Sequence, residues 1–188
     1  MTGILTDDHE LYLYHYYDRR TGPFRNLSDM TPEDAEVLLE RIQRERPGSM
    51  CAKRDETYMR KRRANENIIR TKFLEAGGRT ERSAPHYMVL GHCPWLLSWF
   101  EQPAYLRIPV SEFDLSAVSF TYGDSFPTFS PRVNDGREYR RKVYDYEGIK
   151  KIIEKYGLPQ IWNSDGSHGP ERYIEACVWS DETISRYI

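Results

Sequence analysis

Residues 171–179, ERYIEACVW, place the tightest constraint on how this chain can fold. In a β-strand, successive side chains point to opposite faces of the sheet. One face of this strand would be mostly apolar, with Arg172, Ile174, Ala176 and Val178. The other face would hold two carboxylates among aromatic side chains, with Glu171, Tyr173, Glu175, Cys177 and Trp179. We therefore predict a strand that covers a core on one face and carries two glutamates on the other.

The rest of the chain alternates between strand and helix signals. Short runs of aromatic, aliphatic and β-branched residues predict strands at 11–17, 86–90, 104–110 and 117–122. Apolar residues at helical spacing and helix-capping residues predict helices at 32–46, about 53–74, 95–100 and 145–157. The segments 123–136 and 157–170 have the composition of loops. We find no repeat or linker, so residues 1–188 are predicted to form a single α+β domain.

Length, charge and cysteine content limit the class of protein. A chain of 188 residues can bury one substantial core, and a net charge of -2 excludes a uniformly basic nucleic-acid coat. Three widely spaced cysteines without a CxxC pair indicate neither a disulfide framework nor a zinc site. The acidic N-terminus does not resemble a signal peptide, and no apolar run is long enough for a membrane span. We expect a cytoplasmic protein that binds no membrane and no metal; its oligomeric state stays open.

Positive charge is concentrated in residues 53–72, which contain eight basic and three acidic side chains, a local charge of +5. Such segregation suits a polyanion, either a nucleic-acid backbone or the pyrophosphate of a dinucleotide. The alternative is a solvated helix face, which is the commoner role of a charge run. Four consecutive cations, Arg60, Lys61, Arg62 and Arg63, would project to all sides of a helix. At least one of them should point inward or into a cleft.

His15 and the two glutamates each allow two interpretations. His15 is either a core residue of its tyrosine-rich strand or a functional group. Glu171 and Glu175 are either solvent-facing residues of an edge strand or rigidly held acids that stabilise a developing cation. Because four residues of strand span roughly 13 Å, the two carboxylates cannot serve the same atom. We assign catalysis to Glu171, at the loop end of the strand, and a structural or secondary role to Glu175.

The order of short motifs between about residues 12 and 184 resembles the DarT-like DNA-targeting ADP-ribosyltransferase toxins. The matching stretches are Tyr14-His15, Arg62-Arg63, Gly77-Gly78, His86-Tyr87-Met88, Pro94-Trp95-Leu96-Leu97 and Glu171-Arg172-Tyr173-Ile174. Two stretches depart from the family. Gly91-His92-Cys93-Pro94 stands where the family has an Arg-Ser-Pro-like turn, and the helix expected at 32–46 in the early loop is longer than the resemblance implies. These departures concern the choice of substrate more than the fold.

The resemblance implies a split, mostly antiparallel sheet flanked by helices, and a site that binds NAD as substrate. His15, with Tyr14 beside it, would hold the ribose of NAD, and Tyr87 would line the nicotinamide pocket. An arginine of the Arg62-Arg63 pair would contact the dinucleotide or the acceptor. Glu171 would be the catalytic acid.

The sequence therefore predicts an NAD-dependent ADP-ribosyltransferase that modifies a nucleic-acid base, with DNA as the expected partner. Arg60, Lys61 and Arg62 are the candidate contacts to the nucleic acid. One alternative is a metal-dependent nuclease that uses Asp124, Glu171 or Glu175; another is a nucleic-acid-binding module without catalysis. The acceptor and its base preference stay open.

Overall fold

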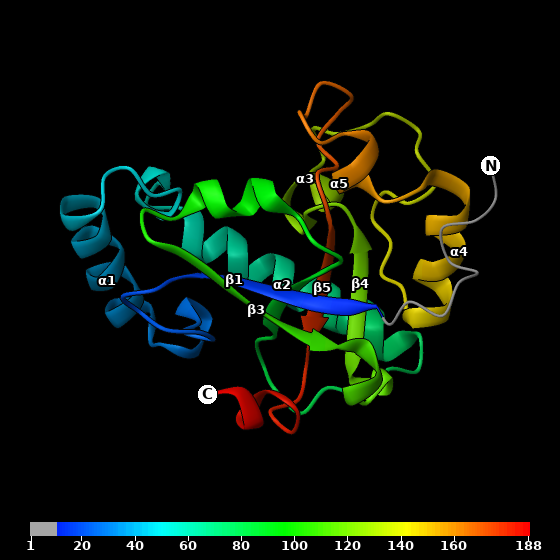
Figure 1. The fold of residues 1–188 in the computed structure, drawn as a ribbon, viewed down its shortest axis with the longest axis horizontal. Coiled ribbons are helices and arrows are strands. Elements are labelled where there is room, and N and C mark those ends of the chain that lie inside the picture. Colours follow the sequence, from blue (N-terminus) through cyan, green and yellow to red (C-terminus); the bar gives the residue numbers. More distant parts are fainter. Residues whose placement is uncertain (1–10) are drawn as a thin grey trace.

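The computed structural model describes residues 11–188, which form an antiparallel sheet with helices on both faces (Figure 1). The sheet has the strand order β3-β1-β2-β5-β4. Its strands are β1 (Tyr12–Asp18), β2 (His86–Leu90), β3 (Pro103–Pro109), β4 (Val118–Tyr122) and β5 (Ile174–Val178). The predicted α+β class is confirmed. Residues 1–10, which contributed to the expectation about a signal peptide, lie outside the described residues.

The helices are α1 (Pro32–Glu45), α2 (Tyr58–Glu75), α3 (Ser125–Phe129), α4 (Tyr146–Tyr156) and α5 (Pro159–Trp162). On one face of the sheet, Ile69 and Phe73 of α2 pack with Cys177 of β5. On the other face, Ile149 and Ile153 of α4 join the main hydrophobic core. α1 lies at the opposite end of the molecule from α4 (Figure 1) and packs on the start of α2. Within residues 11–188, no helix is long and apolar enough to cross a membrane.

The ends of the main helices follow from the capping residues in the sequence. Thr31 caps α1 by accepting a hydrogen bond from the backbone N–H of Asp34, and Pro32 occupies the first helical turn. Asp145 caps α4 through the backbone N–H of Gly148. α4 ends at Gly157, whose φ of 78° lies in the left-handed region that favours glycine.

The alternation expected for the segment before Trp179 is present from Ile174 onward. Ile174, Ala176 and Val178 are buried in the main core, whereas Glu175 and Cys177 point to the opposite face. β5 pairs with β2 on one side and β4 on the other, so it is an interior strand. Glu175 on this strand is 6% exposed, and Glu171, which precedes the strand, is 3% exposed. The interpretation of the two glutamates as solvent-facing residues of an edge strand is therefore wrong.

Several expected boundaries require correction. β5 begins at Ile174 and not at residue 171, and α2 begins at Tyr58 and not near residue 53. The segment expected as a helix at 95–100 is a 3₁₀-helix, Pro94–Trp99. The two segments expected as loops contain α3 and α5, which are too short for the 3.6-residue periodicity to appear in their sequences.

Candidate functional site

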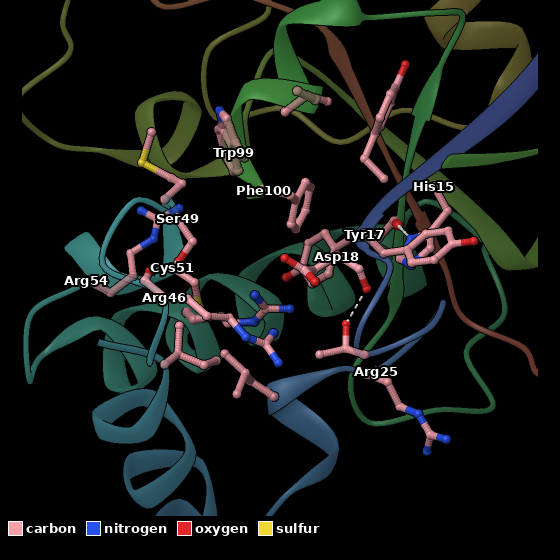
Figure 2. A pocket seen from close by; sticks show the side chains of 18 of the residues that line it. His15, Tyr17, Asp18, Arg25, Arg46, Ser49, Cys51, Arg54, Trp99 and Phe100 are labelled. Carbon is pink, nitrogen blue, oxygen red and sulfur yellow. Dashed lines mark hydrogen bonds between the residues drawn. The ribbon is translucent and has the colours of Figure 1, made fainter. Parts of the chain in front are cut away.

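A cavity of about 570 Å³ lies between the α2 face of the sheet, the helix α1 and the start of α2. This volume falls within the range of about 300–1,000 Å³ that is usual for small-molecule and cofactor sites. Aromatic side chains from distant parts of the chain line it: Tyr14, Tyr16, Tyr17, Tyr58, Tyr87, Trp99, Phe100, Phe126 and Tyr173. Figure 2 shows Phe100 between two groups of lining residues, with Trp99, Arg46, Ser49, Cys51 and Arg54 on one side and His15, Tyr17 and Asp18 on the other.

The helix α1 supplies the outer wall because its apolar stripe is wider than its packing surface. Ala35 and Leu39 are buried against the start of α2. Leu38 and Ile42, on the adjoining part of the stripe, line the cavity instead. The expected apolar positions of this helix are thus divided between holding α1 in place and facing the cavity.

The arginines of the cavity are of two kinds. Arg20 pairs with Asp18, and Arg41 pairs with Glu45. Within residues 11–188, Arg46 and Arg54 form no ion pair although both are half-buried. The Arg54 guanidinium lies 4.5 Å from the ring centre of Tyr58 and 5.7 Å from that of Trp99. One wall therefore presents two cationic groups whose charges are not neutralised by a carboxylate, a suitable environment for an anionic ligand.

Two carboxyl groups, from Asp124 and Glu175, lie on the sheet side of the cavity. Glu175 is 6% exposed and projects from the middle of β5, opposite Thr121 of β4. Asp124 is the N-cap of α3, and its carboxylate accepts hydrogen bonds from the Tyr173 hydroxyl at 2.9 Å and from the backbone N–H of Phe126 at 2.7 Å. Glu175 has longer contacts, with the Ser125 backbone N–H at 3.5 Å and the Cys177 thiol at 3.8 Å.

The environment of Glu175 favours its neutral form. Burial, followed by the nearby charge of Asp124, raises the pKa of Glu175 to about 8. Burial also raises the pKa of the Cys177 thiol and of the Tyr173 hydroxyl well above their usual values. At neutral pH, Glu175 is consequently mostly protonated and lies beside neutral thiol and phenol groups. Strongly shifted carboxyl groups in a cavity are typical of functional sites.

A short turn after β4 brings the two carboxyl groups together. Gly123 has a φ of 106°, and a Cβ at this position would lie 3.3 Å from the Glu171 side chain. The turn leads directly into α3, so Asp124 is fixed by its capping role. The pairing of β4 with β5 places this turn next to Glu175, since Thr121 and Glu175 are register partners.

Glu171, to which catalysis was assigned from the sequence, does not line this cavity. Its carboxylate forms a buried ion pair with Arg140, which also binds Asp135. The same carboxylate lies beside Tyr122 and Tyr139, whose rings belong to the main core. Residues 171–173 are not part of a strand, so the two-residue alternation that would have put Glu171 and Glu175 on one face does not extend to Glu171.

His15 has both ring nitrogens occupied by the backbone. Its Nδ1 donates to the Tyr87 carbonyl oxygen at 2.9 Å, and its Nε2 accepts from the Phe24 backbone N–H at 2.9 Å. Burial of the ring lowers the pKa of His15 to about 4, so the imidazole is neutral at neutral pH. The ring reaches the cavity, yet a hydrogen bond from it to a ligand would replace a bond to the backbone.

The expectation that one cation of the 60–63 cluster points inward is confirmed by Arg62. Its guanidinium donates to Tyr58, Asn26, Ser28 and Glu66, and lies 4.5 Å from the ring centre of Tyr87. Arg63 binds the Met30 carbonyl oxygen outside the cavity. Arg60 and Lys61 are exposed on the first turn of α2. The cluster is thus divided between one buried cation and a surface group.

The cavity gathers Tyr14, His15, Tyr87 and Arg62 from the residues predicted for the site. Tyr87 lines it while its hydroxyl donates to Glu66 at 3.0 Å. Sequence reasoning gave Glu175 only a secondary role and did not select Arg46, Arg54, Trp99 or Phe100. Asp124 carried a detectable signal, because an aspartate after a strand and before Ser-Phe-Pro is a helix-cap pattern.

Comparison of the chain with models of known protein families, with curated proteins and with solved structures gave no match. Within residues 11–188, no group of three or more His, Cys, Asp or Glu side chains is arranged to hold a metal ion. The candidate function is therefore derived from the geometry of the cavity.

Proposed function

We propose that the cavity binds NAD and that the protein transfers ADP-ribose from NAD to a nucleic-acid base, with Glu175 as the catalytic carboxylate in place of Glu171. One observation carries the proposal. An aromatic-walled cavity of about 570 Å³ has, in one wall, two arginines that form no ion pair within residues 11–188 and, in another, the buried Glu175 beside the half-buried Asp124. A dinucleotide has the complementary composition, since it joins two flat rings through a doubly charged pyrophosphate.

Arg46 and Arg54 are the candidate contacts to the pyrophosphate. Guanidinium groups bind phosphate oxygens through paired, charge-assisted hydrogen bonds. Trp99 lies on the arginine side of the cavity, and Phe100 lies between that side and the opposite one (Figure 2), so both rings are placed to pack against a ring or the sugar of the ligand. The adenosine half would then extend toward α1, where Leu38 and Ile42 offer an apolar surface.

Glu175 is the candidate for the chemical step. In that step the bond between the nicotinamide nitrogen and the ribose C1′ breaks, and its electron pair leaves with neutral nicotinamide. Positive charge develops on the sugar before an acceptor nitrogen of the base forms the new bond to C1′ and then loses its proton. A carboxylate on an interior strand stabilises such a cation without having to reorganise. In this step Glu175 acts in its ionised form.

A nucleic-acid acceptor is supported by the position of the remaining basic residues. Tyr58 and Arg62 of α2 line the cavity, and Arg60 and Lys61 are exposed on the intervening turn of the same helix. Arg54, just before the helix, is part of the cavity wall. Positive charge therefore continues from the cavity onto the adjacent surface, which suits a phosphate backbone that enters beside the NAD site.

The proposal is tested by incubating the protein with NAD and a single-stranded oligonucleotide in the presence of EDTA. Chromatography would measure nicotinamide, and mass spectrometry would measure the oligonucleotide. We expect release of nicotinamide and an oligonucleotide whose mass has increased by one ADP-ribose. Shortened oligonucleotides that form only after addition of Mg²⁺ would support the nuclease alternative. Oligonucleotide binding without any reaction would support a binding module.

A further inference from the structure

We propose that Asp124 and Glu175 form a carboxyl pair that takes up the cationic nicotinamide ring of oxidised NAD, and that Glu175 releases one proton when the ring binds. The inference rests on the proposed function, because it assumes that NAD binds in this cavity. It adds a preference for a charged ring and a positioning role for Asp124, neither of which the resemblance to a family implies.

The different bonding of the two side chains determines which carboxyl group loses the proton. Asp124 accepts short hydrogen bonds from the Tyr173 hydroxyl and the Phe126 backbone N–H, which hold its carboxylate in place. Glu175 has only a 3.5 Å contact with a backbone N–H and a 3.8 Å contact with a thiol. Glu175, whose pKa is raised by burial and by the charge of Asp124, is thus the group of the pair that releases the proton.

Among the described residues, the other titratable groups around Glu175 supply no free positive charge that would balance its ionised form. They come from four parts of the fold: Tyr173 and Cys177 around β5, Tyr87 from β2, Glu66 and Arg62 from α2, and Asp124 before α3. Arg62 is the cation of this set, and its guanidinium is engaged by Glu66 and neutral oxygen acceptors. A ligand cation would therefore supply the positive charge that allows both carboxyl groups to ionise together.

The carboxyl pair exchanges one positive charge for another, because one proton leaves Glu175 as one cationic ring binds. Without a cation beside it, Glu175 is a neutral acid next to the charge of Asp124, so the pair has a net charge of -1. When the pyridinium ring enters, Glu175 gives its proton to solvent and the pair then faces the ring with a charge of -2. The dihydronicotinamide ring of NADH is neutral, so its binding gives no reason for the proton to leave. Ionised Glu175 is also the form that the chemical step needs.

The test is a calorimetric titration at pH values from 6 to 9. The probe is carbocyclic NAD, which keeps the pyridinium ring and the pyrophosphate but resists cleavage. ADP-ribose and NADH serve as ligands without a cationic ring. We expect the affinity for carbocyclic NAD to rise by up to about tenfold per pH unit below pH 8 and then to level off, as linkage to one proton requires. The affinities for ADP-ribose and NADH should change much less.

Two substitutions separate the role of Asp124 from a structural one. Asp124→Asn keeps a residue that is favoured at a helix N-cap but removes its charge. In this variant the midpoint of the pH dependence should move down by about one to three units, the usual effect of a nearby charge. Asp145→Asn is the matched control, since Asp145 caps α4 in the same way and does not line the cavity. Its pH midpoint should equal that of the wild type.

The outcomes distinguish this inference from the proposed function. If carbocyclic NAD binds equally well across the pH range, or if Asp124→Asn keeps the wild-type midpoint, the carboxyl-pair inference is wrong although NAD still binds. If neither carbocyclic NAD nor ADP-ribose binds at any pH, the proposed function fails together with the inference. If carbocyclic NAD binds only weakly and ADP-ribose binds well, the cavity does not favour the cationic ring.

Discussion

Replacing Glu171 with glutamine should destabilise the protein, because it breaks a buried ion pair. Glu171 is 3% exposed and Arg140 is 7% exposed, so solvent cannot replace the lost partner. Removing one member of a buried pair costs about 3–5 kcal/mol. Arg140 keeps its hydrogen bonds to Asp135, including one of 2.6 Å, which places the expected loss near the lower limit, about 3 kcal/mol. For a chain of this size, that loss lowers the melting temperature by about 6–12 °C.

Glu175→Gln is the matched substitution, since it makes the same chemical change four residues later in the same segment. At pH 6 the Glu175 carboxyl is mostly protonated, so replacing it with a neutral amide should change stability by no more than about 1 kcal/mol. Urea unfolding, followed by tryptophan fluorescence and circular dichroism, would measure both variants. A Glu171→Gln protein as stable as the wild type, with a strongly destabilised Glu175→Gln protein, would refute the placement of the two carboxyl groups.

Three further predictions concern the remaining residues of the site. Arg62→Ala leaves the buried Glu66 without its cation and should lower the free energy of unfolding in urea by about 3–5 kcal/mol. Replacing the exposed Arg60 with alanine should change it by no more than about 0.5 kcal/mol, and equal effects would contradict the division of this cluster. Arg54→Ala should weaken NAD binding about tenfold to a hundredfold in calorimetry, because it removes a charged hydrogen-bond donor, and unchanged affinity would exclude it from the phosphate site. In the folded state the pKa of His15 is about 4, against 6.5 in the unfolded state, so His15 makes the free energy of unfolding fall as the pH is lowered from 6.5 to 4. The urea midpoint of His15→Gln should fall less than that of the wild type over this pH range, and identical pH profiles would contradict the prediction.

The fold could largely be predicted from the sequence because its elements carry strong local signals. Thr31 and Asp145 mark helix starts by their capping chemistry, and the period-two pattern of Ile174, Ala176 and Val178 marks a strand with one face in the core. α3 and α5 were missed because helices of this length have no periodic pattern to detect. The local sequence pattern is thus sufficient to predict a helix or strand that is long or that begins with a characteristic capping residue.

The site was less accessible to prediction because it depends on contacts between distant segments. The alternation rule placed Glu171 and Glu175 on one face, but the bend before Ile174 and the attraction of Arg140 turn Glu171 toward the main core. No local signal in the sequence indicates that Arg140 is its partner. Arg46 and Arg54 likewise become a single cationic wall only when α1 and the segment after it fold beside Trp99.

The release of nicotinamide from NAD by the wild type, Glu175→Gln and Glu171→Gln proteins tests the central claim most directly. The three proteins would be compared at pH 8 and at a temperature at which circular dichroism shows each of them to be folded. Losing the carboxylate beside the reacting sugar should lower the rate of the Glu175→Gln protein by about 10²–10³, the usual effect of removing one transition-state contact. The folded Glu171→Gln protein should keep a rate close to that of the wild type. Wild-type activity in Glu175→Gln, with activity lost in folded Glu171→Gln, would contradict the assignment of Glu175 as the catalytic carboxylate of this cavity.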